Sequence, residues 1–164
     1  PNPIWTETRA FSNIPPCQIL AAHVRSASFP GQKGVVEYNQ PFVADSHAFV
    51  FNGLLNNVSA PFPVEGRIGS QKIWSLLRRF LNCSRPAAGI SALVRLLEFW
   101  AREIQALNIG LFEDRRLFVY CQRTDDGQYY QLRVHRTPSL TMVCSEELEG
   151  LPWKSIPLNV VLEL

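Results

Sequence analysis

The sequence predicts an α+β layered domain, in which helices cover an antiparallel sheet. Two apolar, strand-like stretches come first, at 17–28 and 48–55, and two helical stretches follow between 70 and 107. From residue 108 onward the hydrophobic period changes to two, which is typical of strands. At 164 residues and 46% hydrophobic composition, the chain is long enough to bury one core of this kind.

The first strand is predicted over 17–28, "CQILAAHVRSAS", whose first half is apolar and whose second half is polar. It ends at Phe29-Pro30-Gly31, a turn-forming sequence. The second strand, 48–55, follows a loop that contains Gly34, Asn39 and Pro41. Because both strands end in polar residues, we expect them to deliver side chains to one cleft.

Two amphipathic helices are predicted next. The first covers 70–81, with Ser70 as its expected N-cap and Arg78 and Arg79 on its polar side. The second is expected over 86–107, because Pro86 suits a first helical turn. Its inner stripe has helical spacing and comprises Ile90, Leu93, Val94, Leu97, Ala101 and Ile104.

The remaining elements are predicted as an antiparallel meander. Stretches 117–121 and 130–134 alternate apolar and polar residues on either side of Asp125-Asp126-Gly127, which is a frequent hairpin turn. Further strands are expected at 140–145 and 160–164.

Charge and cysteine content narrow the function classes. The net charge is +2, and no basic run is interleaved with aromatic residues, so we expect no nucleic-acid partner. No apolar stretch reaches the roughly 20 residues of a membrane span, so we expect no membrane partner. Cys17, Cys83, Cys121 and Cys144 form no Cys-x-x-Cys pair and have no histidine at metal-ligand spacing. We therefore expect a reduced, cytoplasmic protein without a metal or other cofactor.

Asn52-Gly53 permits two interpretations. Asn-Gly is among the commonest turn dipeptides, and a plain turn is the simpler one. An oxyanion hole is the alternative, since an Asn carboxamide and a Gly backbone N–H can both donate to the developing negative oxygen of an acyl transfer.

His23-Val24-Arg25 is similarly open. Strand alternation places His23 and Arg25 on one face, where they can be structural polar groups satisfied by neighbouring carbonyls. Alternatively, Arg25 binds a substrate carboxylate with its planar guanidinium, and His23 supports it. No Ser-His triad follows from Ser26, Ser28 or Ser46, because proximity in sequence does not make one and no Gly-x-Ser-x-Gly elbow occurs.

Two of these stretches together resemble a known family. "AHVRSASFPG" (22–31), the loop Asn39-Gln40-Pro41-Phe42 and "FVFNGLLNN" (49–57) are similar to the core motifs of class II glutamine amidotransferases, which are N-terminal nucleophile (Ntn) hydrolases. Pro3-Ile4-Trp5 and "CSEELEGLPWKSIPLNVVLEL" (144–164) resemble its small stand-alone branch, which includes the amidohydrolase of ergothioneine synthesis. The similarity spans almost the whole chain.

The resemblance implies a four-layer αββα sandwich in which an N-terminal cysteine attacks a γ-carboxamide and its own α-amino group serves as base. It implies that Asn52 and Gly53 form the oxyanion hole, that Arg25 holds the substrate α-carboxylate and that Ser28 lines the pocket. In the family the cysteine lies upstream of the Pro-Ile-Trp segment. We therefore expect residues 1–164 to be the C-terminal two-thirds of one amidotransferase domain, inactive alone, with an upstream fragment or partner chain supplying the cysteine.

Two further departures bear on specificity. Relatives carry Gly-x-Thr-Asp-Ser-Glu, whose Asp pairs with the substrate α-ammonium, where this chain has Gly66, Ile68, Gly69, Ser70 and Gln71. Asp45, Glu65 or an acid outside this chain would have to replace that Asp, and Phe51 replaces the usual His.

Three hypotheses follow from these observations. The first is an amidohydrolase acting on a small-molecule γ-glutamyl-type amide, with a possible acceptor synthase as partner. The second is a non-catalytic binding or assembly subunit, and the third is an unrelated α+β domain with coincidental motifs.

Overall fold

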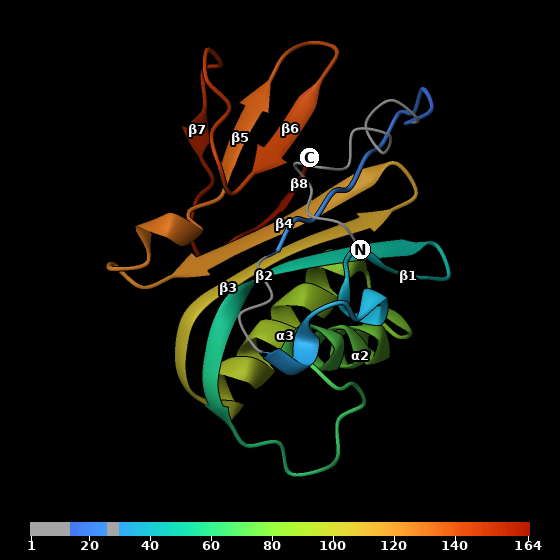
Figure 1. Ribbon diagram of the computed structural model, residues 1–164, viewed down its shortest axis with the longest axis vertical. Helices are drawn as coiled ribbons and strands as arrows, with labels where there is room; N and C mark the ends of the chain where they lie inside the picture. Colours follow the sequence, from blue (N-terminus) through green and yellow to red (C-terminus); the bar gives the residue numbers. More distant parts are fainter. Residues whose placement is uncertain (1–13, 26–29) are drawn as a thin grey trace.

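The computed structural model describes residues 14–25 and 30–164, which form three layers (Figure 1). The middle layer is a five-stranded antiparallel sheet, and a smaller three-stranded sheet lies on one side of it. The five-stranded sheet has the order β1 (Phe42–Ala44), β2 (His47–Val58), β3 (Ala101–Glu113), β4 (Arg116–Arg123) and β8 (Val161–Glu163). The smaller sheet has the order β6 (Thr141–Cys144), β5 (Arg133–Arg136) and β7 (Lys154–Ser155). The mixed helix-and-antiparallel-sheet class is thus confirmed.

Helices α2 (Gly69–Leu81) and α3 (Pro86–Trp100) cover the other face of the five-stranded sheet (Figure 1). Alternate residues of β2 and β3, such as Phe49 and Leu111, face these helices and are fully buried. The ring of Phe49 stacks on Trp74 of α2 at 5.1 Å between centroids. This layer forms the main hydrophobic core of the described chain.

A second core lies on the opposite face, between β4 and the smaller sheet. Val119 and Cys121 of β4 are buried there against Leu132 and Ile156. The alternation along β4 therefore serves two cores, because its neighbours Phe118 and Tyr120 belong to the helix side.

Three short 3₁₀ turns complete the described chain: η2 (Pro30–Gln32), η3 (Val36–Tyr38) and η4 (Gln128–Tyr130). No helix in the described ranges combines the length and the apolar character that a membrane crossing requires.

The bounds of helix α2 agree with the prediction, but the predicted N-cap residue is wrong. Ile68 occupies the N-cap position without a side-chain hydrogen bond, and Ser70 is a buried residue inside the helix. The side chain of Gln71 accepts a hydrogen bond from the N–H of Arg67 at 2.9 Å, which satisfies one donor before the helix.

Helix α3 is shorter than predicted. The expected helix over 86–107 ends at Trp100, and Ala101 begins β3. Ala101 and Ile104 continue the helical spacing by coincidence, and pairing with β2 decides the structure there.

The predicted Asp125-Asp126-Gly127 hairpin is wrong. The hairpin between β3 and β4 closes at Asp114 and Arg115, and Asp114 has a φ of 52°. Residues 125–127 instead lead into η4, because β5 pairs with β6 and β7 rather than with β4.

The sequence predicts a strand over 17–28, but residues 17–25 form no strand and pair with none. Residues 26–29 lie outside the described ranges. The predicted alternation nevertheless holds, since Ala21, His23 and Arg25 are half-buried whereas Ala22 and Val24 are exposed.

Candidate functional site

Asn52 and Gly53 lie in the middle of strand β2, so the turn interpretation is wrong. Asn52 pairs with Asn108 of β3 and Gly53 pairs with Leu107. The strand continues in register until an irregularity between Leu54 and Leu55. Asn52 and Gly53 thus have an extended backbone that is held by pairing with β3.

The Asn52 side chain points away from the helices. Phe51 faces the helix core, and alternation places Asn52 on the face that carries the smaller sheet. Its cross-strand partner Asn108 is on the same face and is only 2% exposed. Asn52 itself is half-buried, so it lies near the edge of the covered area.

The backbone N–H of Gly53 points to the edge of β2 that faces away from β3. The N–H and C=O of one residue in a strand point to the same side, and successive residues alternate. Phe51 uses both groups toward Gln40, on the β1 side. The N–H of Gly53 therefore points to the same side, where β1 has already ended. The Gly53 N–H at this edge and the Asn52 carboxamide on the adjoining face are thus two donors on adjacent residues.

Gly53 is also required by its packing. A Cβ at this position would lie 2.3 Å from the backbone oxygen of Ala106. Gly53 does not have a positive φ, so close approach of the β3 backbone is the reason for a glycine here.

Arg25 is anchored next to this region. Its Nε donates to the Asn39 side-chain oxygen at 3.4 Å, and its Nη2 donates to the Gln32 carbonyl at 3.2 Å. Gln40, adjacent to Asn39, binds the backbone of Phe51, so residues 39–40 connect Arg25 with the Asn52 strand. Ser28, the other predicted pocket residue, lies outside the described residues.

His23 is a half-buried histidine close to Arg25 in the chain. Its Nδ1 is buried and has no hydrogen-bond partner within the described ranges. Burial is the larger cause that lowers the pKa of His23 from 6.5, and the positive charge of Arg25 lowers this pKa further. His23 is therefore neutral at physiological pH.

The lowered pKa of His23 can be tested by titration. We expect an NMR titration to give His23 a pKa below 6.5, and Arg25→Gln to raise it without restoring 6.5, because burial is the larger cause. Since the folded pKa is lowered, the stability that neutral His23 contributes is present above pH 6.5 and is lost as pH falls through the folded pKa. A His23 pKa that is unchanged in Arg25→Gln would show that the charge of Arg25 does not lower it.

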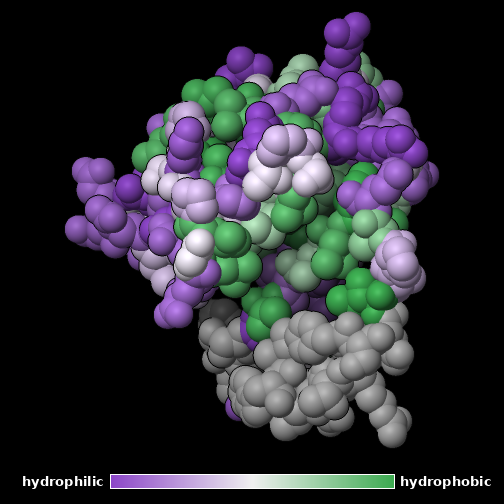
Figure 2. Space-filling model, turned by 90° about the horizontal axis from the view of Figure 1, so that it is seen from above, coloured by the Kyte–Doolittle hydropathy of each residue, from purple (hydrophilic) through white to green (hydrophobic). Residues whose placement is uncertain are grey.

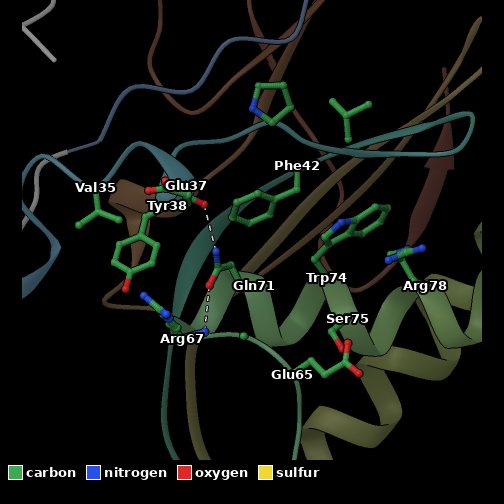
Figure 3. A pocket seen from close by; sticks show the side chains of 13 residues that line it. Val35, Glu37, Tyr38, Phe42, Glu65, Arg67, Gln71, Trp74, Ser75 and Arg78 are labelled. Atoms are coloured by element: carbon green, nitrogen blue, oxygen red, sulfur yellow. Dashed lines mark hydrogen bonds between the residues drawn. The ribbon is translucent and has the colours of Figure 1, made fainter.

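A groove of about 870 Å³ lies between α2 and the segment that leads into β1. Figure 3 shows Tyr38, Phe42 and Trp74 along it, with Arg67 below Tyr38 and Glu65 below Ser75. The side chain of Gln71 joins the two walls of the groove: it accepts a hydrogen bond from the N–H of Arg67 and donates one to the Glu37 carbonyl at 3.0 Å. Neither Asn52, Gly53 nor Arg25 lines this groove, so it is separate from their cluster.

The acids considered as replacements for a missing Asp lie apart from Asn52. Glu65 lines the groove, and Asp45 is in the β1–β2 turn with its carboxylate 3.7 Å from Arg78. In the described part of the chain, no three His, Cys, Asp or Glu residues gather as metal ligands would.

Two cysteines are poor nucleophiles for a physical reason. Burial raises the pKa of the thiols of Cys121 and Cys144, so both are protonated at neutral pH.

The face that carries Asn52 is partly apolar. Figure 2 looks onto the molecule from the side of the smaller sheet and shows hydrophobic residues over the middle, with hydrophilic ones around them. On the strands of this face, Val43 is 70% and Leu54 is 40% exposed. Ile19 and Ala21 line a pocket together with Val43, so the described chain covers the β1–β2 end of this face only in part.

Sequence reasoning assigned no role to two residues of this site, Gln40 and Asn108. Gln40 lies in the recognised loop Asn39-Gln40-Pro41-Phe42, before Pro41, which lacks an N–H and interrupts strand pairing. Asn108 had no local signal, because its position opposite Asn52 depends on the β2–β3 register.

No protein-family model matches this chain, and no curated protein matches it. Solved structures do. One is a glutamine aminotransferase class-II domain protein from Silicibacter pomeroyi, with a TM-score of 0.57 and 15% identity over 76% of this chain and 70% of that chain. Another is a predicted glutamine amidotransferase from Pseudomonas aeruginosa, with a TM-score of 0.50 and 14% identity over 78% of this chain and 62% of that chain.

A third similar structure is the glutamine phosphoribosylpyrophosphate amidotransferase from B. subtilis, with a TM-score of 0.57 and 15% identity. The match covers 86% of this chain and 31% of that chain. This chain therefore spans less than two thirds of two of these three structures. At these identities the similarity concerns the fold alone, which resembles that of these glutamine amidotransferase structures.

Proposed function

We propose that this chain is the oxyanion-hole part of a class II amidotransferase-like amidohydrolase. The observation that carries the proposal is a pair of donors on adjacent residues of β2: the carboxamide of Asn52, which projects from the face of the sheet, and the N–H of Gly53, which points to its edge. The shared fold with glutamine amidotransferase structures supports it.

The proposed chemistry is acyl transfer through a thioester. A cysteine thiolate attacks the carbonyl carbon of a γ-glutamyl-type amide, and the carbonyl oxygen becomes an oxyanion that Asn52 and Gly53 stabilise. The C–N bond then breaks, the amine leaves with a proton and a thioester remains. Water hydrolyses the thioester to the carboxylate and regenerates the thiol.

The proposal requires a second component. An upstream fragment or a partner chain would carry the cysteine with its free α-amino group and would complete a four-layer αββα Ntn sandwich. Residues 1–164 are then the C-terminal two-thirds of one domain, acting in the cytoplasm and inactive alone. The exposed side chains of Val43 and Leu54, at the β1–β2 end of the sheet, leave a surface for that component. Where the released amine is ammonia, an acceptor synthase would use it.

Substrate recognition would depend on Arg25, with Ser28 in the same pocket. The first turn of α2 contains no acidic residue, so the charge that relatives offer to an α-ammonium group is missing there. Free glutamine should therefore be bound poorly unless another acid pairs with its α-ammonium group.

The test is an assay of the complete assembly against glutamine and a series of γ-glutamyl amides, with quenched reactions examined for a covalent acyl-cysteine. Amide cleavage with such an adduct is expected. An assembly that contains the cysteine but cleaves none of these amides would refute the proposal.

Arg25→Ala in this assembly is expected to raise KM by about 10- to 100-fold, because a charged hydrogen bond is lost. The effect on kcat should be small, since the α-carboxylate does not change during the reaction. Arg95→Ala, an exposed arginine of α3, is the matched control and should leave KM unchanged. Equal KM values in both variants would exclude Arg25 from substrate binding.

A non-catalytic binding or assembly subunit is the second candidate. The missing acid in the first turn of α2 favours it. A nucleophilic cysteine upstream of Pro1 would decide for the enzyme, and its absence from the whole assembly would decide for the subunit.

A further inference from the structure

Strand β1 stops short of Phe51, and the side chain of Gln40 continues its pairing. The β1–β2 register aligns Phe42 with Phe49, so Gln40 falls opposite Phe51. Pro41, between them, has no N–H to donate. The Gln40 carboxamide donates from Nε2 to the Phe51 carbonyl at 3.1 Å and accepts from the Phe51 N–H through Oε1 at 2.5 Å. One side chain thus supplies both bonds of a backbone pair.

These two bonds fix the peptide that leads into Asn52. The Phe51 carbonyl and the Asn52 nitrogen belong to one planar peptide unit. Holding that oxygen therefore fixes the direction in which the Asn52 side chain leaves the strand.

Asn108 lies opposite Asn52 on the neighbouring strand β3. Its Nδ2 donates to the Tyr130 carbonyl, and its Oδ1 is buried without a partner in the described part of the chain. This Oδ1 makes no hydrogen bond to Asn52 in the structure, but Cβ atoms of directly opposed residues are about 4.5–5.5 Å apart, so a side-chain rotation would bring the two carboxamides into bonding range. The Asn52 Nδ2 has two hydrogens, so it can donate one to Asn108 and the other to an oxyanion.

We propose that Gln40 and Asn108 are positioning residues, which hold Asn52 in the orientation that an oxyanion requires. Gln40 sets the backbone and Asn108 sets the carboxamide. The inference rests on the proposed function, since it concerns the same site.

The test compares two ligands of the complete, cysteine-containing assembly in Gln40→Met and Asn108→Leu. Glutamate γ-semialdehyde reports on the oxyanion: the thiol adds across its C=O, an S–C bond forms and the proton ends on the former carbonyl oxygen. Glutamate binds without such an oxygen. We expect each variant to weaken semialdehyde binding and to lower kcat by about tenfold, the loss of one net hydrogen bond, with KM and glutamate affinity nearly unchanged.

Gln71→Met is the matched control. Gln71 also makes two carboxamide-to-backbone bonds, at 2.9 and 3.0 Å, but neither involves β2. The control should keep the wild-type ratio of semialdehyde to glutamate affinity, and this ratio does not depend on how much protein is folded.

A wild-type ratio in both test variants, even with lowered stability, would overturn the positioning role. An assembly whose wild type neither cleaves amides nor binds the semialdehyde would refute the proposed function, and the positioning role with it. An active wild type with unaffected variants would refute only the positioning role.

Discussion

Asn52→Ala in the active assembly is expected to lower kcat by about 10²–10³-fold, the usual cost of losing one oxyanion donor. The loss should appear equally in kcat and kcat/KM, because the hydrogen bond is made in the transition state rather than to the ground-state amide. Stability should change little, since Asn52 is only half-buried. Steady-state kinetics with a γ-glutamyl amide measures the effect.

Asn56→Ala is the control for this experiment. Asn56 lies on the same strand, and its Nδ2 donates to the Glu103 carboxylate at 3.0 Å on the exposed surface. It should keep wild-type kinetics. If Asn52→Ala is as active as Asn56→Ala, Asn52 is not an oxyanion donor.

Gly53→Ala is expected to lower the free energy of unfolding by about 3 kcal/mol, at the upper end of the usual range for overpacking. The added Cβ would lie 2.3 Å from the Ala106 carbonyl oxygen and 2.8 Å from the Phe51 ring. A ring can move, but the carbonyl belongs to the β2–β3 ladder, so the strands must separate locally. Urea denaturation measures the change.

Gly69→Ala provides the comparison, because a Cβ there meets nothing within 4 Å and Gly69 begins α2. This change should be neutral or should stabilise by about 0.4–1 kcal/mol. Equal unfolding midpoints for the two variants would show that the strand tolerates a side chain at Gly53.

The helices were predictable because their signal is local. The apolar spacing of α2 and the Pro at the start of α3 are sufficient to place both. The end of α3 was not predictable, because Ala101 continues the helical stripe and only the partner strand makes it extended. Residues 14–25 show the converse case, in which a strand-like alternation lies among described residues that offer it no partner strand.

The candidate site was predictable in part for the same reason. Asn52-Gly53 and Arg25 are recognisable from short motifs, although Asn-Gly taken locally favours a turn. Their supports were not, because Gln40 and Asn108 meet Asn52 only through strand register. Asn108 in particular has no pattern of its own in the sequence, because its place opposite Asn52 depends only on register.

The open edge of β2 beyond Gln40 has a consequence for how the protein behaves in solution. Unpaired backbone groups along a strand are a template for pairing with another chain. The stretch Asn52 to Val58 has neither a charge nor a proline to prevent such pairing, and Leu54 and Val58 are exposed. The edge that leaves a donor free for a reacting oxygen is therefore also the place where separately expressed copies would associate, and co-expression with the missing component would protect it.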